Sequence, residues 1–258
     1  MRLRVRFSKV GKIRFIGHRD VARVMERAVR RIGLPVAYSK GFSPRMKLSF
    51  GLALPTGYES DAEFVELPLA PGGCEGSVIV GRRSTYSPCE QELPETAPSY
   101  CTIADALSEA LPVGMDASAV MLSDGGQSLQ AAIQWCGWQF EIVGLGAQPA
   151  QQAVADFLAA DTVVTERVHK GETVSSNVRA GVGTLRLVGR SDRGAVLSAE
   201  LSAAPRVVRP SELVPALAPT HEMGIARRTH QWTTGAAGRA EPAVPARCAN
   251  RHKELISA

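Results

Sequence analysis

The chain of 258 residues lacks the cysteine pattern of a metal site or of a disulfide-stapled domain. It holds five cysteines, an odd number, and no two of them have the spacing usual for metal ligands. Scattered cysteines of this kind are typical of reduced thiols in a reducing compartment. We therefore expect a cytoplasmic protein that holds no metal ion and no other cofactor.

Long hydrophobic runs and recognisable catalytic motifs are absent as well. No run of about 18 apolar residues is present, so no segment is expected to span a membrane. The first residues, Met1 to Phe7, alternate between apolar and basic side chains and lack the apolar region of a secretion signal. Neither a phosphate-binding glycine loop nor a Ser-His-Asp triad is recognisable. We therefore expect a binding protein rather than an enzyme.

Acidic residues are scarce in the first 50 positions. That stretch has 14 lysines and arginines against two acids, a net charge of +12, whereas the other 208 residues carry 16 bases and 23 acids, a net charge of −7. A local basic patch on an otherwise acidic protein is the electrostatic footprint of a phosphate-backbone binder, and RNA is the expected partner. A membrane surface would also attract the patch, but the basic helix lacks the Trp, Phe or Leu face of an interfacial anchor.

Hydrophobic periodicity in residues 1–134 predicts a β-α-β-β-α-β module, the ferredoxin-like order. Residues 70–99 within it are rich in Pro, Gly, Ser and Glu, and we expect an irregular loop there. The predicted strands are Leu3–Phe7, Lys47–Leu54, Ala62–Leu67 and Ala117–Leu122, and the predicted helices are His18–Ile32 and Thr102–Leu111. A short additional strand at Ile13–Ile16, before the first helix, is left open.

Residues 135–232 repeat this element order, so the fold class expected is α+β, with two ferredoxin-like modules in tandem. Residues 233–258 lack periodicity and predict a disordered tail. The predicted strands are Gln139–Val143, Asp161–Val168, Thr184–Val188, Ala195–Leu201 and Gly224–Trp232. The predicted helices are Pro149–Ala160 and Pro210–Leu217, preceded by a short helix at Ser128–Ile133.

The first helix has one apolar and one basic face. Its basic residues are Arg19, Arg23, Arg27, Arg30 and Arg31, opposed only by Asp20 and Glu26. Like charges four residues apart destabilise a helix by themselves, so this row favours an anionic partner over the alternative of a merely solvated surface.

The loop from Tyr38 to Lys47 interleaves aromatic and basic residues, as in single-stranded nucleic-acid contacts. Tyr38 and Phe42 offer stacking faces, although Phe42 is also a candidate core residue, and Gly41 allows close backbone approach. With Lys12 and the helix arginines, Lys40, Arg45 and Lys47 complete the predicted phosphate contacts. A second, smaller basic and aromatic cluster spans Arg227–Trp232.

His18 and Asp20 lie two residues apart at the predicted start of the helix. One interpretation is a polar pair that relays a proton or contacts a substrate, which makes them the candidate catalytic residues. The other is helix capping, in which Asp20 satisfies free N–H groups and His18 occupies the cap. Convergence of His18, Asp20 and Tyr38 in one pocket would favour an enzyme.

The runs Phe15–Asp20, Leu34–Lys47 and Ala53–Gly57 resemble the radical-SAM-linked family, a domain found free-standing or fused behind a radical SAM domain. The Arg228–Trp232 run extends the resemblance weakly into the second half. Met46 stands where the family more often has proline, a departure expected to loosen the loop. The resemblance implies an accessory, RNA-related domain without an established reaction. The chain has no Cys-x-x-x-Cys-x-x-Cys run, so it cannot itself hold a radical-SAM iron–sulfur cluster.

The expected function is therefore RNA binding by an accessory protein that presents tRNA or rRNA to a modification or processing enzyme, such as a radical SAM or RNA-processing partner. Two alternatives stay open. One is an RNA-modifying enzyme that uses His18 and Asp20, and the other is a protein-docking module with a basic face.

Overall fold

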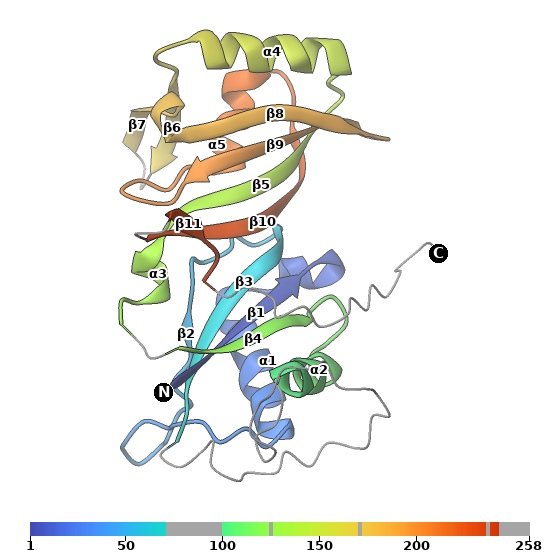
Figure 1. Ribbon diagram of the computed structural model, residues 1–258. Coiled ribbons are helices and arrows are strands. Elements are labelled where there is room, and N and C mark those ends of the chain that lie inside the picture. Colours follow the sequence, from blue (N-terminus) through green and yellow to red (C-terminus); the bar gives the residue numbers. More distant parts are fainter. Residues whose placement is uncertain (71–99, 124–125, 170–171, 236–237, 243–258) are drawn as a thin grey trace.

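The computed structural model describes residues 1–70, 100–123, 126–169, 172–235 and 238–242 (Figure 1). Its main feature is one mixed sheet of nine strands, in the order β4-β1-β3-β10-β5-β9-β8, with β2 paired to β3 and β11 paired to β10. Five α-helices accompany the sheet in the described residues. The predicted α+β class is confirmed. The predicted irregular loop lies outside the described residues, apart from Ala70.

The first half supplies one end of the sheet. Strand β1 alternates between half-buried and buried residues, so that one of its faces lies on the core, and it pairs antiparallel with β3 and β4 on its two edges. The half consists of β1 (Arg2–Lys9), the 3-10 helix η1 (Gly11–Phe15), α1 (His18–Arg31), β2 (Ser49–Phe50), β3 (Glu59–Pro68), α2 (Tyr100–Ala110) and β4 (Ala117–Ser123).

The second half supplies the other end. Its elements are α3 (Leu129–Ala132), β5 (Ile133–Val143), α4 (Ala147–Ala159), β6 (Val164–His169), β7 (Glu172–Asn177), η2 (Arg179–Gly181), β8 (Val182–Ser191), β9 (Gly194–Ser202), α5 (Pro210–Leu217), β10 (Met223–Gly235) and β11 (Gly238–Ala240). Pro210 begins α5 at the first helical position, where its missing N–H has no intrahelical partner to lose.

The two halves meet where β10 runs parallel to β3, at the centre of Figure 1. Arg227 lies opposite Glu59, and Arg228 lies opposite Ser60. On its other edge β10 pairs antiparallel with β5. The last long strand in the sequence is therefore the one that joins both halves into a single sheet.

Helices α1 and α2 of the first half and α4 and α5 of the second half cover the same face of this sheet. Phe7, in the core beside α1, lies directly opposite Glu63, which is hydrogen-bonded to Arg228. Arg228 in turn lies opposite Trp138, in the core beside α4 and α5. Because laterally adjacent strand residues point to the same side, this row links the two helical layers.

Three local predictions were wrong. Residues 13–16 belong largely to η1 rather than to a strand. Only Ser49 and Phe50 of Lys47–Leu54 are in a strand. The strand predicted at Asp161–Val168 is confirmed as β6, which pairs with β7 in a separate hairpin. The tail expected to be disordered from Thr233 instead continues β10 to Gly235 and forms β11. Residues 243–258 lie outside the described part.

Candidate nucleic-acid interface

The arginines of α1 lie on its exposed side, because Val21, Met25, Ala28 and Val29 are buried against the sheet. We call Arg19, Arg23, Arg27, Arg30 and Arg31 the α1 basic face. Arg23 Nη1 lies 3.2 Å from Asp20 Oδ1, and Arg30 Nη2 lies 3.9 Å from Glu26 Oε2. Within the described residues, the other three arginines of this face have no carboxylate partner.

The loop that follows α1 forms a short hairpin. Tyr38 pairs with Met46, Ser39 N donates to Arg45 O at 2.8 Å, and Arg45 N donates to Ser39 Oγ at 2.9 Å. Met46 is 5% exposed and packs in the core. Its side chain therefore anchors one side of the hairpin in the core, and the loosening expected relative to proline stays a prediction.

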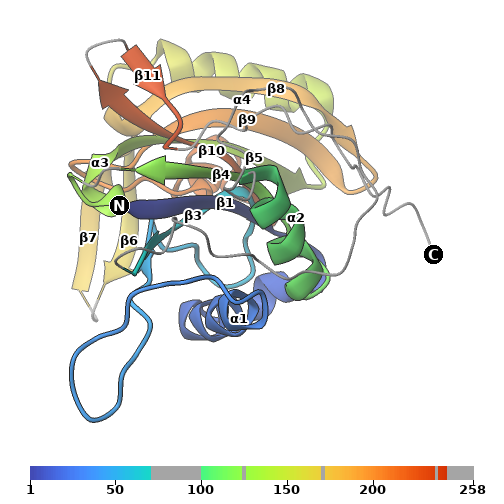
Figure 2. The same cartoon turned by 60° about the horizontal axis from the view of Figure 1, so that its bottom comes forward.

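The tip of this loop points into solvent. Phe42 is fully exposed, which rules out its alternative role as a core residue, and Tyr38 is 43% exposed. Gly41 has φ of 134°, a conformation that favours glycine. Lys40, Arg45 and Lys47 are exposed, and Figure 2 shows the loop projecting from the body of the molecule.

The predicted contact residues follow α1 along its length. The chain enters α1 from η1, which carries the exposed Lys12, and leaves it towards the loop. A helix of 14 residues is about 21 Å long. The predicted cations therefore lie on three successive segments of the chain, with Lys12 before one end of α1 and the loop after the other.

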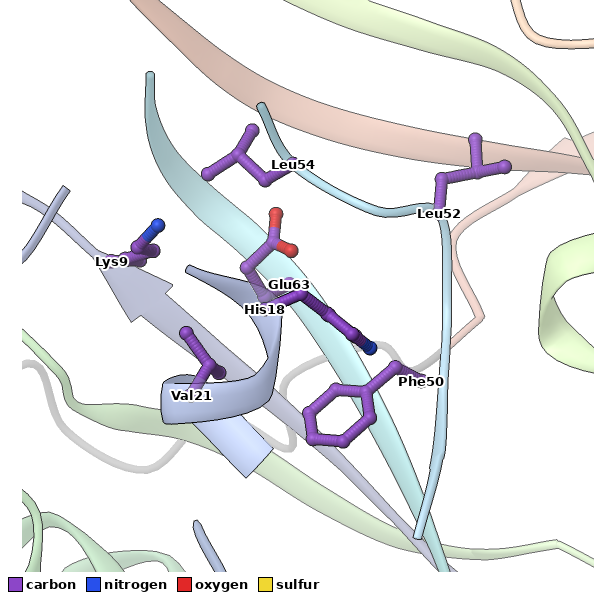
Figure 3. A pocket seen from close by; sticks show the side chains of 7 residues that line it. All are labelled: Lys9, His18, Val21, Phe50, Leu52, Leu54 and Glu63. Carbon is purple, nitrogen blue, oxygen red and sulfur yellow. The ribbon is translucent and has the colours of Figure 1, made fainter. Parts of the chain in front are cut away.

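His18 does not meet Asp20 or Tyr38 in a pocket. Its ring contacts the Phe50 ring edge-on, with centroids 4.9 Å apart, at the mouth of a cavity of about 10 Å³ (Figure 3). The side chains around it are Lys9, His18, Val21, Phe50, Leu52, Leu54 and Glu63. This volume is room for about one water molecule, not for a substrate.

The capping interpretation also needs correction. Gly17 occupies the N-cap of α1, and no side chain caps it. Asp20 lies in the first turn, as predicted, and accepts a hydrogen bond from Arg23 rather than capping the helix.

Lys9 and Glu63, which line this cavity, form a buried ionic cluster with Arg228 that sequence reasoning missed. Arg228 is 2% exposed. Its guanidinium donates hydrogen bonds to Glu63 Oε1 at 2.5 Å and to Leu52 O at 2.7 Å. Lys9 Nζ donates to Arg14 O and Ile16 O at 3.1 and 2.9 Å. The available signal was positional, because Lys9 continues the buried alternation of β1.

Burial governs the pKa values in this cluster. Desolvation lowers the pKa of Lys9, while the charge of Glu63 opposes the shift and that of Arg228 reinforces it. Desolvation likewise raises the pKa of the Cys136 thiol, against the opposing charge of Arg228. Cys136 is therefore held as a buried thiol rather than as a reactive thiolate.

Glu59 is another buried carboxylate of β3 and is 3% exposed. It accepts hydrogen bonds from Arg227 Nη2 at 2.6 Å, from Gly11 N at 2.8 Å and from Arg14 Nη1 at 3.2 Å. Burial alone would raise the pKa of Glu59, but these bonds outweigh it and lower the pKa.

The second predicted cluster, Arg227–Trp232, lies in β10, and its residues differ in burial because they point to different faces of the sheet. Arg228 and Gln231 are buried, whereas His230 is exposed and Trp232 is half-buried. His230 and Trp232 stack on each other at 4.9 Å with an interplanar angle of 5°.

Two classes of site are not found in the part of the chain that the structure describes. No described helix is long and apolar enough to cross a membrane. No group of three or more described His, Cys, Asp or Glu side chains is placed to hold a metal ion.

The comparisons with known proteins give one family. A family model described as "Uncharacterized protein conserved in bacteria (DUF2344)" matches residues 2–77 and 74–210. No curated protein matches the chain. A similar solved structure, "Crystal Structure of a Cbf5-Nop10-Gar1 Complex", has a TM-score of 0.45 and 9% identity over 89% of this chain and 48% of the other. The chain spans about half the length of that protein, and a likeness this weak carries no argument about function.

Proposed function

We propose that this chain, which belongs to the bacterial family DUF2344, binds RNA through the α1 basic face and the Tyr38–Lys47 loop. In this proposal it is an accessory protein that presents a tRNA or rRNA segment to a modification or processing enzyme. The observation that carries the proposal is the set of exposed cations along α1 and the loop that have no acidic partner among the described residues.

The distribution of ion pairs supports this surface over the rest of the basic N-terminal stretch. Five of its 14 cations are engaged within the fold, namely Arg2 and Arg4 by Glu66, Arg6 by Glu241, Arg14 by Glu59, and Lys9 by burial. The other nine are the cations of the predicted interface. With Asp20 and Glu26 they leave a net charge of +7, which favours an RNA backbone.

The arrangement of the sheet supports the finer interpretation that each half is a ferredoxin-like module. In the first half β1 lies between β4 and β3, and β2 pairs with β3; in the second half β5 lies between β10 and β9, and β8 pairs with β9. Both arrangements are antiparallel. We also propose a radical SAM or RNA-processing enzyme as the partner, on the basis of the sequence resemblance.

The cavity beside His18, which neither Asp20 nor Tyr38 lines, favours binding over catalysis because it is small. An RNA-modifying site needs polar groups around a substrate-sized cavity, whereas the space beside His18 is about 10 Å³. For this reason the enzyme alternative is the weaker one.

The test compares the salt dependence of RNA binding in two triple variants. Replacing Arg19, Arg27 and Arg31 with Ala removes three cations that lack carboxylate partners. Each lost phosphate contact should reduce the slope of log affinity against log salt by about 0.7 for single strands, or about 2 in total. Fluorescence anisotropy with a labelled single-stranded RNA measures the slope.

A matched control removes the same charge elsewhere. Arg190, Arg193 and Arg209 are exposed residues of the second half, outside the proposed surface. Their replacement with Ala should leave the slope nearly unchanged. Equal slopes for the wild type and the α1 variant, at equal thermal stability, would refute the proposed surface.

A further inference from the structure

The sheet of the second half has a face that points away from its helical core. On β5, Cys136, Trp138, Phe140 and Ile142 belong to that core, so the alternate residues point to the opposite side. We call this side the open face. Its members are Trp135, Gly137 and Gln139 of β5, Arg227, His230 and Trp232 of β10, Ser198 and Glu200 of β9, Thr184 and Arg186 of β8, together with Arg239 of β11.

The aromatic rings of the open face are gathered at one end. Trp232 lies directly opposite Trp135 on the neighbouring strand. His230 stacks on Trp232 almost in parallel, at 4.9 Å, and the Arg239 guanidinium lies 5.0 Å from the Trp135 ring centroid. His230 is exposed, and both tryptophans are half-buried rather than enclosed in a core.

Two glycines leave space for these rings. A Cβ at Gly137 would lie 2.9 Å from Thr229 Oγ1, which would have to shift, and 3.3 Å from His230 Nδ1, which would have to give by a few tenths of an ångström. A Cβ at Gly183 would lie 3.2 Å from Trp135 Cζ3. The positions of both rings therefore depend on the absence of a side chain beside them.

A polar row lies next to the rings. Arg186, Ser198, Gln139 and Arg227 are consecutive neighbours across β8, β9, β5 and β10. Gln139 is exposed and offers both a donor and an acceptor, while Arg186 is exposed and has no ion pair within the described part of the chain. Base edges and phosphates are the groups that such side chains bind.

We infer that the open face is a stacking platform for unpaired bases of single-stranded RNA. Aromatic rings on an open sheet are a general means of stacking about two such bases, with neighbouring polar groups reading their edges. The inference rests on the proposed function for the identity of the ligand, but it assigns a second surface on different elements. A helical apolar peptide fits less well, because Glu200, Gln139 and Arg186 interrupt any continuous apolar patch.

The two surfaces differ in physical character, and this makes them separable. Arg227 is paired with Glu59, and Arg239 with Glu200 at 2.8 Å, so most charges of the open face are already neutralised. Binding there should rely on stacking, which releases no counterions, and should leave the salt slope to the α1 basic face.

The experiment uses the full chain and a fluorescein-labelled oligouridine of about 12 nucleotides, within the usual range of single-strand sites. Replacing His230 and Trp232 together with Ala should weaken binding about 5- to 150-fold, the loss expected for one stacked base, with the salt slope unchanged. Trp232→Phe should retain most of the affinity because it keeps a ring. Leu158→Ala, at a half-exposed apolar residue of α4, is the control for general effects of truncation.

Tryptophan fluorescence gives a second readout. Trp135 and Trp232 should be quenched when bases stack on them, whereas Trp138 is buried on the other face. We expect RNA to quench the fluorescence of the wild type. The quenching should be smaller in the His230 and Trp232 variant, whose thermal midpoint should be unchanged.

The outcomes distinguish the two proposals. Unchanged affinity and quenching in the His230 and Trp232 variant would overturn the platform, while a flattened slope in the α1 triple variant would still support the proposed function. A loss confined to the platform variant would support the platform and refute the α1 surface. The platform would also be overturned if the wild type did not bind the oligouridine. The same holds if the His230 and Trp232 variant lost binding to a protein partner and kept its binding to RNA.

Discussion

Replacement of Glu63 with Gln tests the buried ionic cluster that joins the two halves. The change preserves the shape of the side chain and removes only its negative charge. In the wild type, the carboxylate of Glu63 faces two cations, Lys9 and Arg228, and Arg228 donates to it at 2.5 Å. The variant leaves both cations buried without an anion in the cluster.

The expected loss of unfolding free energy is about 3–5 kcal/mol, the cost of removing one partner from a buried ion pair. The loss should lie towards the upper end because Arg228 is 2% exposed and Lys9 is 3% exposed, so neither cation regains water. With a urea dependence of about 3 kcal/mol per molar, the midpoint of unfolding should fall by about 1–2 M.

Two further variants serve as controls for the Glu63→Gln measurement. Combining Glu63→Gln with Arg228→Met removes one of the two unpaired cations and should recover part of the lost stability, which a double-mutant cycle measures as coupling. Asp20→Ala breaks an exposed pair with Arg23 at 3.2 Å and should cost at most about 1 kcal/mol. If Glu63→Gln cost no more than Asp20→Ala in urea unfolding, the reasoning about burial would be refuted.

Two other predictions concern stability. The lowered pKa of Glu59 means that its contribution is present above the unfolded-state pKa, about 4.3, and is lost as the pH falls through the folded-state pKa. The stability gap between the wild type and Glu59→Gln should therefore narrow on acidification, and a gap in urea midpoints that stays constant with pH would contradict this. In thermal denaturation, Met46→Ala should cost about 2–5 kcal/mol because the side chain is in the core. Phe42→Ala, at the exposed loop tip, should cost no more than about 0.5 kcal/mol, and equal losses for the two variants would contradict the assigned burial.

Local elements could be predicted from the sequence because their signals are local. The apolar period of α1 places Val21, Met25 and Val29 on one face, and the structure has the helix one residue shorter than predicted. The bounds of α5 agree with the prediction because Pro210 begins it. The basic loop was recognisable for the same reason, since its aromatic and basic residues are adjacent in the chain.

The burial of charged side chains could not be predicted from local sequence patterns. Nothing near Arg228 in the sequence separates it from Arg227, yet one is buried and the other is half-exposed. The difference arises because Glu63, Leu52 and Trp138, all distant in the chain, surround Arg228 in the folded sheet. Likewise, the contact of His18 with Phe50 joins residues that are distant in the chain and depends on how α1 packs on the sheet.

Amino-acid order alone determined the α+β composition, the amphipathic α1 and the location of the basic surplus, because periodicity and charge are properties of short segments. Only the tertiary structure decided that β10 would lie between β3 and β5. That pairing brings Trp232 beside Trp135 and Arg228 beside Glu63. Such contacts depend on strand pairing across long stretches of chain, which is selected by the packing of the whole core and not by any local pattern.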